Sequence, residues 1–511
     1  MKKQQTQDIF DGHATKTAPA RPKTRLFSLI INCLLLAIVL VVPAWSQSAG
    51  LKLPPYKKVV LKNGMTVLLM EQTEVPLVSF SFLIKAGTVS DPAGKEGVAG
   101  LTAGLLRKGT KTRTADQISN ELDFIGGGLG AGAGLDFTSG SAEFVKKDLD
   151  KGLDLLADTL LNPTFPEDEV KKALTQSSNG IKAAKDNPQA VIGQYFNAYL
   201  FGAHPYGRPA GGDEKSLANI TRDDIVKFYS EKYRAFNTIL TVVGDFNTAE
   251  MEAKLNAKFG SWGGEMMTRT IPPAKKGGKP MTVVDLPGDA VQPETAAPKP
   301  FVGKKLLLVD KPNTVQTYFY IGNVGVARTN QDRVPINVVN TLFGGRFTSM
   351  LNSELRIKTG LTYGARSSFS LNRQPGPFVI SSYTQTATTE KALDLALDIL
   401  KRLHEKGITE DELKSAKNYI KGQFPTSVET TDQLARTLML NEFYGLGDGE
   451  INDYYAKIDA MTLADAQRII KQYYPLENLV FVLIGDGNKI RDIAKKYAPK
   501  MDSKIITDAG F

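Results

Sequence analysis

The chain has 511 residues, more than a single domain of ordinary size, and 42% of them are apolar and 23% charged. This globular composition excludes a wholly disordered chain, a collagen and a coiled coil. The single cysteine excludes a disulfide framework, a cysteine zinc ribbon and an iron–sulfur centre, and three histidines leave little material for a multi-histidine metal site. The formal net charge of the whole chain is +9.

The first 46 residues have the pattern of an export signal. Basic side chains gather in residues 1–25, an apolar run fills residues 26–42, and residues 44–46 (AWS) fit a small-x-small cleavage pattern. We predict that residues 1–46 are a cleaved signal and that the rest of the chain is exported to the periplasm. The alternative is an uncleaved anchor in the inner membrane, because residues 26–42 are at the lower limit of length for a span. The remaining net charge of +5, without a basic block interleaved with aromatic residues, predicts no nucleic-acid partner.

Beyond this leader, strand and helix patterns follow one another without strict alternation. Apolar or alternating runs predict strands at residues 66–70, 77–84, 238–245, 305–310, 315–321 and 479–486. Helical periods predict helices at residues 148–161, 221–233, 390–407 and 409–424. Thr221 and Thr409 precede acidic first turns and are the predicted N-caps. The mixture favours α+β layers over a doubly wound sheet.

An internal repeat divides the body of the chain. The matching pairs, offset by about 240, are residues 220–247 with 461–488 and residues 152–160 with 392–400. We predict two homologous domains of about 220 residues, each a mostly antiparallel sheet with helices packed on it. They span residues 51–270 and 301–500, and seven prolines in residues 271–300 predict a linker between them.

Several segments of the body, in order, resemble a known family. They are residues 61–110 (beginning LKNGMTVLLM), 204–212 (HPYGRPAGG), 242–246 (VVGDF) and 343–364 (FGGRFTSMLNSELRIKTGLTYG). Across residues 55–490 the chain is similar to the pitrilysin, insulinase and mitochondrial-processing-peptidase family of inverted-motif zinc metallopeptidases. In catalytic members a helix carries H-x-x-E-H, whose histidines bind Zn²⁺ and whose glutamate activates water, and a later glutamate is the third ligand.

The resemblance implies that this chain has lost that chemistry. Gly100 and Gly104 stand at the two histidine positions, Ala103 at the glutamate position and Gly180 at the third ligand. Glycine and alanine have no side-chain donor atom, so we predict no metal and no catalysis by the family mechanism in this chain alone. Zinc is expected in a homologous partner subunit that carries the motif.

Arg356 and Tyr363 match a pair that the second domain of the family contributes to the catalytic centre. The resemblance implies that they bind the peptide substrate and stabilise its oxyanion, donated by a zinc-free subunit to a zinc-bearing partner. From composition alone, they would be a surface arginine and a half-buried tyrosine beside a glycine turn.

Three further features have both a structural and a functional interpretation. His204, in the HPYG turn, and His404, late in a helix, are predicted to be structural rather than metal ligands. Gly344-Gly345 is either a short form of the family's substrate loop or a turn. The glycine-rich residues 124–144 are either a strand pair to which a peptide adds a strand or a flexible hairpin, and they lack the Gly-Lys-Ser/Thr of a phosphate loop.

Together these features predict an exported, zinc-free, non-catalytic subunit of a heterodimeric zinc peptidase, contributing to proteolysis only with its partner. One alternative is a peptide-binding scaffold or chaperone-like protein with no role in cleavage. Another is a hydrolase with an unrecognised site, which would cleave peptides alone and resist chelators. Contact with a membrane is expected only through the leader, if it stays attached.

Overall fold

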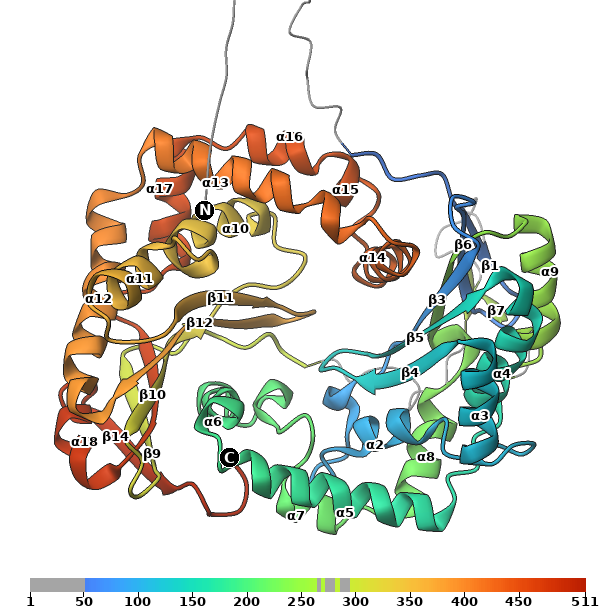
Figure 1. Ribbon diagram of the computed structural model, residues 1–511, viewed down its shortest axis with the longest axis horizontal. Helices are drawn as coiled ribbons and strands as arrows, with labels where there is room; N and C mark the ends of the chain where they lie inside the picture. Colours follow the sequence, from blue (N-terminus) through green and yellow to red (C-terminus); the bar gives the residue numbers. More distant parts are fainter. Residues whose placement is uncertain (1–50, 264–267, 272–280, 285–294) are drawn as a thin grey trace, which may run out of the picture. The chain divides into compact units, whose positions relative to one another are not determined.

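The computed structural model describes residues 51–263, 268–271, 281–284 and 295–511 (Figure 1). The body of the chain, from residue 50 on, forms one compact unit. The predicted signal or anchor, residues 1–46, and much of the predicted linker, residues 271–300, lie outside the described residues. Among the helices that the structure describes, none has the length and apolar character that crossing a membrane requires.

The first half of the body forms a six-stranded mixed sheet. Its strands, in spatial order, are β1 (Lys57–Val60), β2 (Thr66–Glu71), β6 (Thr238–Gly244), β3 (Leu77–Ile84), β5 (Thr138–Val145) and β4 (Gly128–Ala133). Only β2 and β6 pair in parallel, so the sheet is mostly antiparallel. The glycine-rich strand β4 lies at an edge.

The second half repeats this arrangement. Its strands, in the corresponding order, are β14 (Lys500–Ile505), β9 (Lys304–Asp310), β13 (Leu479–Gly485), β10 (Gln316–Val324), β12 (Pro375–Gln385) and β11 (Ala365–Leu371). The edge strands β1 and β14 differ, because β1 is antiparallel to its neighbour and β14 is parallel. A separate pair, β7 (Thr268–Ile271) and β8 (Met281–Val284), lies between the halves in sequence. All six predicted strand runs are strands, and the predicted α+β class is confirmed.

Each sheet carries helices of its own half on one face. On the first sheet these are α2 (Val98–Leu105), α3 (Ala115–Ile125), α4 (Leu149–Leu161), α8 (Arg222–Lys232) and α9 (Thr248–Phe259). On the second they are α10 (Arg333–Asn340), α12 (Thr389–Lys406), α13 (Glu410–Gln423), α17 (Leu463–Tyr473) and α18 (Gly487–Ala494). Thr221 and Thr409 are the N-caps of α8 and α13, as predicted, and each forms a capping box with the residue three positions on.

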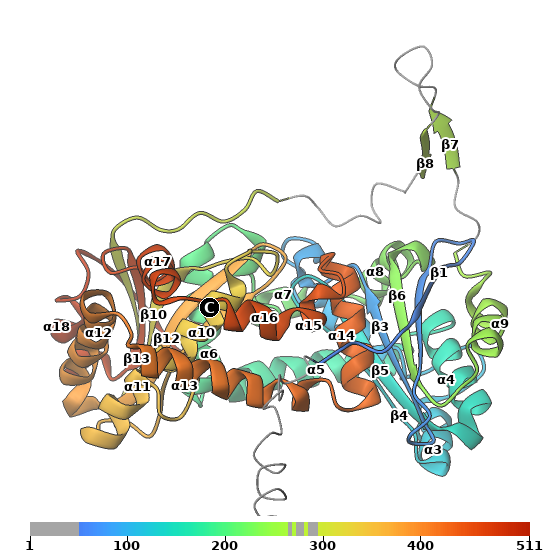
Figure 2. The ribbon, with the colours of Figure 1, turned by 90° about the horizontal axis from the view of Figure 1, so that it is seen from above.

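The opposite face of each sheet is covered by a helix from the other half. Helix α6 (Pro188–Phe201) packs on β9, β12 and β13, and α14 (Thr431–Tyr444) packs on β2, β3 and β6. Both views show α14 beside the first sheet and α6 beside the second (Figures 1 and 2). The two helices lie at corresponding places in the repeat, so the halves exchange equivalent helices. The other helices are α5 (Glu167–Ala184), α7 (Glu214–Ala218), α11 (Met350–Asn352), α15 (Gly449–Asn452) and α16 (Tyr454–Asp459).

Hydrogen bonds around Tyr206 join two equivalent hairpin tips, one from each half. The Tyr206 hydroxyl donates to Asp136 Oδ1 at 2.6 Å, in the β4–β5 turn. In the β11–β12 turn, the Arg373 backbone N–H donates to Asp136 Oδ2 at 2.7 Å and that of Gln374 to the Tyr206 oxygen at 2.9 Å. Asp136 is buried, and a buried carboxylate without hydrogen-bond partners would destabilise the fold. These bonds supply such partners.

Candidate functional site

Helix α2 carries three of the four positions at which the family has its zinc chemistry. The helix follows Gly97, whose φ of 106° is left-handed and whose Cβ would approach the carbonyl oxygen of Gly211 to 3.1 Å, so only glycine fits. The Asp91 carboxylate accepts the backbone N–H groups of Gly97 and Ala99 at 2.8 Å each. Burial raises the pKa of Asp91 to about 7, although these two hydrogen bonds oppose the shift. Asp91 therefore fixes the start of the helix.

Gly100 and Gly104 open onto a pocket of about 510 Å³ between α2 and α5. The α5 wall contains Ala173, Gln176 and Ser177, while Ala103 of α2 is buried and does not line the pocket. A Cβ built on Gly100, Gly104 or Gly180 meets no atom within 4 Å. The space that ligand side chains would need is therefore present, and the side chains are absent.

The residues that surround this pocket do not fit a zinc ion. Its one carboxylate, Glu169, lies 2.7 Å from Lys172 Nζ and 4.0 Å from Lys108 Nζ, so two ammonium groups already compete for it. Within the parts of the chain that the structure describes, no three His, Cys, Asp or Glu side chains cluster closely enough to hold a metal ion. Gly180 lies on α5 but is absent from the pocket wall.

Arg356 and Tyr363 lie on a surface segment of the second half. Arg356 belongs to a wide helical turn, Ser353–Lys358, and its guanidinium lies 4.9 Å from the centre of the Phe347 ring. Tyr363 is 79% exposed, not half-buried, and Phe347 and Ile357 are also exposed, at 61% and 55%. Neither Arg356 nor Tyr363 lines the α2–α5 pocket, so this chain does not bring the predicted residues together.

The glycine-rich segment has the geometry of the first of its two interpretations. Residues 128–133 and 138–145 pair as β4 and β5, and β5 pairs in turn with β3. Along the edge strand β4, a Cβ on Gly128, Gly130 or Gly132 would meet nothing within 4 Å. The glycines therefore leave open space above and below β4. On the edge itself, the Leu129 carbonyl oxygen already accepts from Arg107 Nη1 at 2.8 Å, so an added peptide strand would have to displace this side chain.

Both histidines of the body make structural contacts. His204 Nδ1 accepts the Tyr206 backbone N–H at 3.1 Å, and burial lowers the pKa of His204, so the ring stays neutral. His404 Nε2 lies 2.7 Å from the Tyr474 carbonyl oxygen, in the last turn of α12. The Gly344-Gly345 pair ends a wide turn after α10, where a Cβ on Gly344 would lie 2.3 Å from the Ser367 backbone nitrogen. Close packing against β11 thus explains Gly344.

Two features of the structure have no signal in the sequence. One is the Asp136–Tyr206 network: Tyr206 belongs to the HPYG motif, but no motif marks Asp136 as its partner. The other is a pocket of about 440 Å³ in the second half, which contains Arg328, Arg333 and Asn441. Its wall is assembled from several distant segments, so no linear motif could reveal it.

Comparison with known proteins places the chain in a family. Residues 66–214 match the family model for insulinase (peptidase family M16), and residues 219–420 match that for the peptidase M16 inactive domain. An uncharacterised zinc protease of Rickettsia bellii is 28% identical over 373 residues, which is 72% of this chain and 83% of the relative. A similar protein of Bacillus subtilis is 23% identical over 433 residues, which is 84% of this chain and 99% of the relative.

Solved structures share the fold. A peptidase M16 inactive domain from Pseudomonas fluorescens has a TM-score of 0.75 at 24% identity, covering 84% of this chain and 98% of its own. A protease from Helicobacter pylori has a TM-score of 0.74 at 23% identity, covering 85% and 100%. The resemblance drawn from the sequence is thereby confirmed, and the chain belongs to the M16 family of peptidases.

Proposed function

We propose that this chain is the zinc-free, non-catalytic subunit of an exported heterodimeric M16 peptidase. The observation that carries the proposal is the pocket between α2 and α5, which keeps the room for a zinc site but has Gly100 and Gly104 in its wall. A chain without donor atoms at these positions needs a homologous subunit that carries them. That subunit is the proposed partner, and an extended peptide is the proposed substrate.

The exposed segment around Arg356 is the surface that meets the partner. Phe347, Ile357 and Tyr363 are large side chains left uncovered on this chain, and a protein contact would bury them. Arg356 supplies a fixed positive charge and Tyr363 an O–H donor. In the complex both groups lie beside the peptide carbonyl oxygen that becomes negative during cleavage.

Cleavage of a quenched fluorescent peptide library tests the proposal. The purified chain, a zinc-motif homologue from the same organism, and their mixture are each assayed with and without a chelator. We expect cleavage above that of the homologue only in the mixture, and complete loss of it with the chelator. A mixture no faster than the homologue alone contradicts the proposal for that pair.

Variants of the exposed segment assign the roles. We expect Arg356→Ala and Tyr363→Phe to slow cleavage by the mixture about a hundredfold, because each removes a group that stabilises the oxyanion. Lys358→Ala is the matched control, since Lys358 is exposed on the same turn and forms an ion pair with Glu354. Equal effects of all three variants would mean that the segment acts only in assembly.

A peptide-binding scaffold or chaperone-like protein is the second candidate function. The position of β4 at the edge of its sheet favours it, because strand addition needs neither zinc nor a partner. This candidate predicts that the chain alone binds unfolded peptides and that Arg356→Ala leaves this binding unchanged. Fluorescence anisotropy of a labelled extended peptide measures both.

A further inference from the structure

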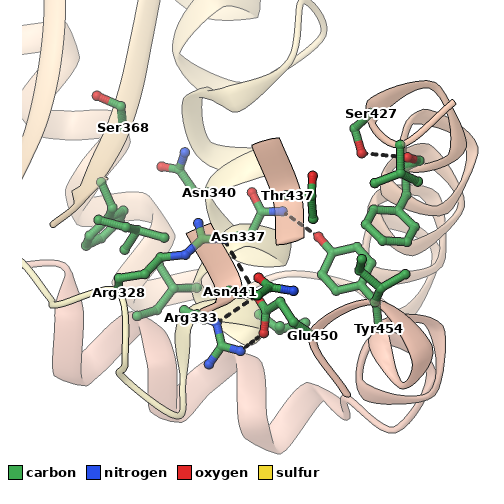
Figure 3. Close-up of a pocket in the computed structure, with 17 residues that line it drawn as sticks. Arg328, Arg333, Asn337, Asn340, Ser368, Ser427, Thr437, Asn441, Glu450 and Tyr454 are labelled. Carbon is green, nitrogen blue, oxygen red and sulfur yellow. Dashed lines mark hydrogen bonds and ion pairs between the residues drawn. The ribbon is translucent and has the colours of Figure 1, made fainter. Parts of the chain in front are cut away.

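The second pocket, of about 440 Å³, is lined by residues of the C-terminal half, and none of them lines the α2–α5 pocket (Figure 3). Its wall is formed by α10, α14, α15 and α16 together with β11 and the segments beside them. Aromatic and aliphatic side chains, among them Phe369, Phe424 and Ile451, form the apolar part of the wall. The rest of the wall is polar and includes Arg328, Arg333, Asn441 and Glu450.

The charges in this pocket do not balance. Arg333 forms an ion pair with Glu450 through two hydrogen bonds, one of them from Nε to Oε1 at 3.1 Å. Both side chains are largely buried. Arg328 reaches the same carboxylate only loosely, with Nη2 3.8 Å from Oε1. Two guanidinium groups thus share one carboxylate, which leaves about one positive charge in a partly enclosed site.

Asn441 adds an unpartnered polar group to the same wall. Its side chain is 6% exposed, and its Nδ2 is buried without a hydrogen-bond partner among the described residues. Arg328 Nε is also buried without a hydrogen-bond partner among these residues, while the Arg328 side chain as a whole is 32% exposed. Buried polar groups are normally paired, because each unpaired one costs about 1–3 kcal/mol. Two such groups at one pocket indicate a site completed by a ligand.

We propose that this pocket binds a carboxylate that carries an apolar body. The carboxylate supplies the second counter-ion, pairing with Arg328 and accepting from the Asn441 amide. The apolar body packs against Phe369, Phe424 and Tyr454, whose hydroxyl is already engaged by Asn337 at 3.3 Å. The C-terminal residue of a peptide and a free amphipathic acid share this chemistry.

Isothermal titration calorimetry with the purified chain tests this binding. The probes are acetyl-Ala-Ala-Phe with a free carboxylate, the same tripeptide as its C-terminal amide, and octanoate. We expect the free-acid peptide to bind at least tenfold more tightly than the amide, because only the acid is charged. If octanoate binds and the peptide acid does not, the ligand is a free acid, and the assignment of the pocket to apolar carboxylates still holds.

Two variants and a control locate the site. Arg328→Met removes the under-neutralised charge and should weaken binding of the acid about tenfold or more. Asn441→Asp supplies the second carboxylate from the chain itself, so it should abolish binding without lowering the midpoint of urea unfolding. Arg436→Met is the matched control, because Arg436 is exposed on α14 and absent from the pocket wall.

Three results would overturn the inference: binding of the peptide acid and the amide with equal affinity, native affinity in both pocket variants, or no binding of any probe. The inference goes beyond the proposed function and does not rest on it. Binding is measured on the chain alone, whereas the proposed function is measured by cleavage in a mixture, so either can fail without the other.

Discussion

Each glycine at a lost zinc-ligand position lies inside a helix, where glycine is about 1 kcal/mol less favourable than alanine. Neither packing nor backbone conformation demands these glycines, because a Cβ at Gly100, Gly104 or Gly180 has open space. Gly97, three residues earlier, differs, since its left-handed φ and its neighbours do require glycine. The fold therefore tolerates side chains at the three lost positions.

We predict that ligands can be restored at these positions. The triple variant Gly100→His, Gly104→His and Gly180→Glu should fold and bind one zinc ion per chain, because histidines four residues apart on α2 face the same pocket. Metal content after dialysis, measured by mass spectrometry, checks this. The matched control is the triple alanine variant, which should be more stable than the native chain and bind no zinc.

A folded histidine variant without zinc would contradict this prediction. It would show that α2 and α5 do not bring the three positions within reach of one ion. The alanine control separates that outcome from simple unfolding. Loss of stability in the control would instead mean that the glycines serve a contact that the isolated chain does not show.

Asp91 fixes the start of helix α2, and we predict that its titration changes the free energy of unfolding with pH. The pKa of Asp91 is raised to about 7 from an ordinary value of 3.8, with burial as the main cause. Between these values the folded chain binds more protons than the unfolded chain at this residue. Its contribution to the free energy of unfolding therefore falls as pH rises from about 4 to 7, by at most about 1.4 kcal/mol per pH unit, and is constant above.

Urea unfolding at pH 5, 6, 7 and 8 checks the sign. Asp91→Asn keeps a side-chain oxygen for the backbone of α2 but cannot titrate in this range. We expect the native chain to lose stability relative to this variant as pH rises to 7. Because other groups titrate alike in both proteins, the difference isolates Asp91. If the stability of the native chain relative to Asp91→Asn stays constant or increases as pH rises to 7, the raised pKa of Asp91 is refuted.

The elements themselves were largely predictable, and the reason is local. Strands such as β13 are continuous apolar runs because both of their faces are buried. The apolar sequence of β13 does not reveal which helices cover its two faces. Leu479, Phe481 and Leu483 face the helices of their own half, whereas Val480, Val482 and Ile484 face α6 from the other half.

Sites, like strands, can be predicted from the sequence only where their residues are close together along the chain. The lost zinc site is predictable because Gly100, Ala103 and Gly104 occupy one short motif on one helix. Arg328 and Asn441 meet only after more than a hundred residues of chain have folded around them. Asp136 and Tyr206 are likewise 70 residues apart. Periodicity and spacing carry no signal for such pairs, because tertiary packing alone makes them neighbours.

At the scale of the whole molecule, the exchange of α6 and α14 makes each half part of the other's core. Leu438 on α14 belongs to the second half in sequence, yet it is buried against β2, β3 and β6 of the first. Neither sheet can keep both faces covered if the other half unfolds. We therefore expect residues 51–511 to unfold as one cooperative unit, although the chain contains a repeat.

Truncating Leu438 tests this coupling. Leu438→Ala should lower the free energy of unfolding by about 2–5 kcal/mol, as other buried leucines do. Hydrogen exchange should accelerate in β2 and β6, which are some 200 or more residues away in sequence, because α14 is their cover. The matched control is Leu403→Ala on α12, an equally buried leucine that packs in the core of its own half. Its first effect should appear in the second sheet. If Leu438→Ala accelerates exchange only in the second half, the two halves are independent folding units despite the exchanged helices.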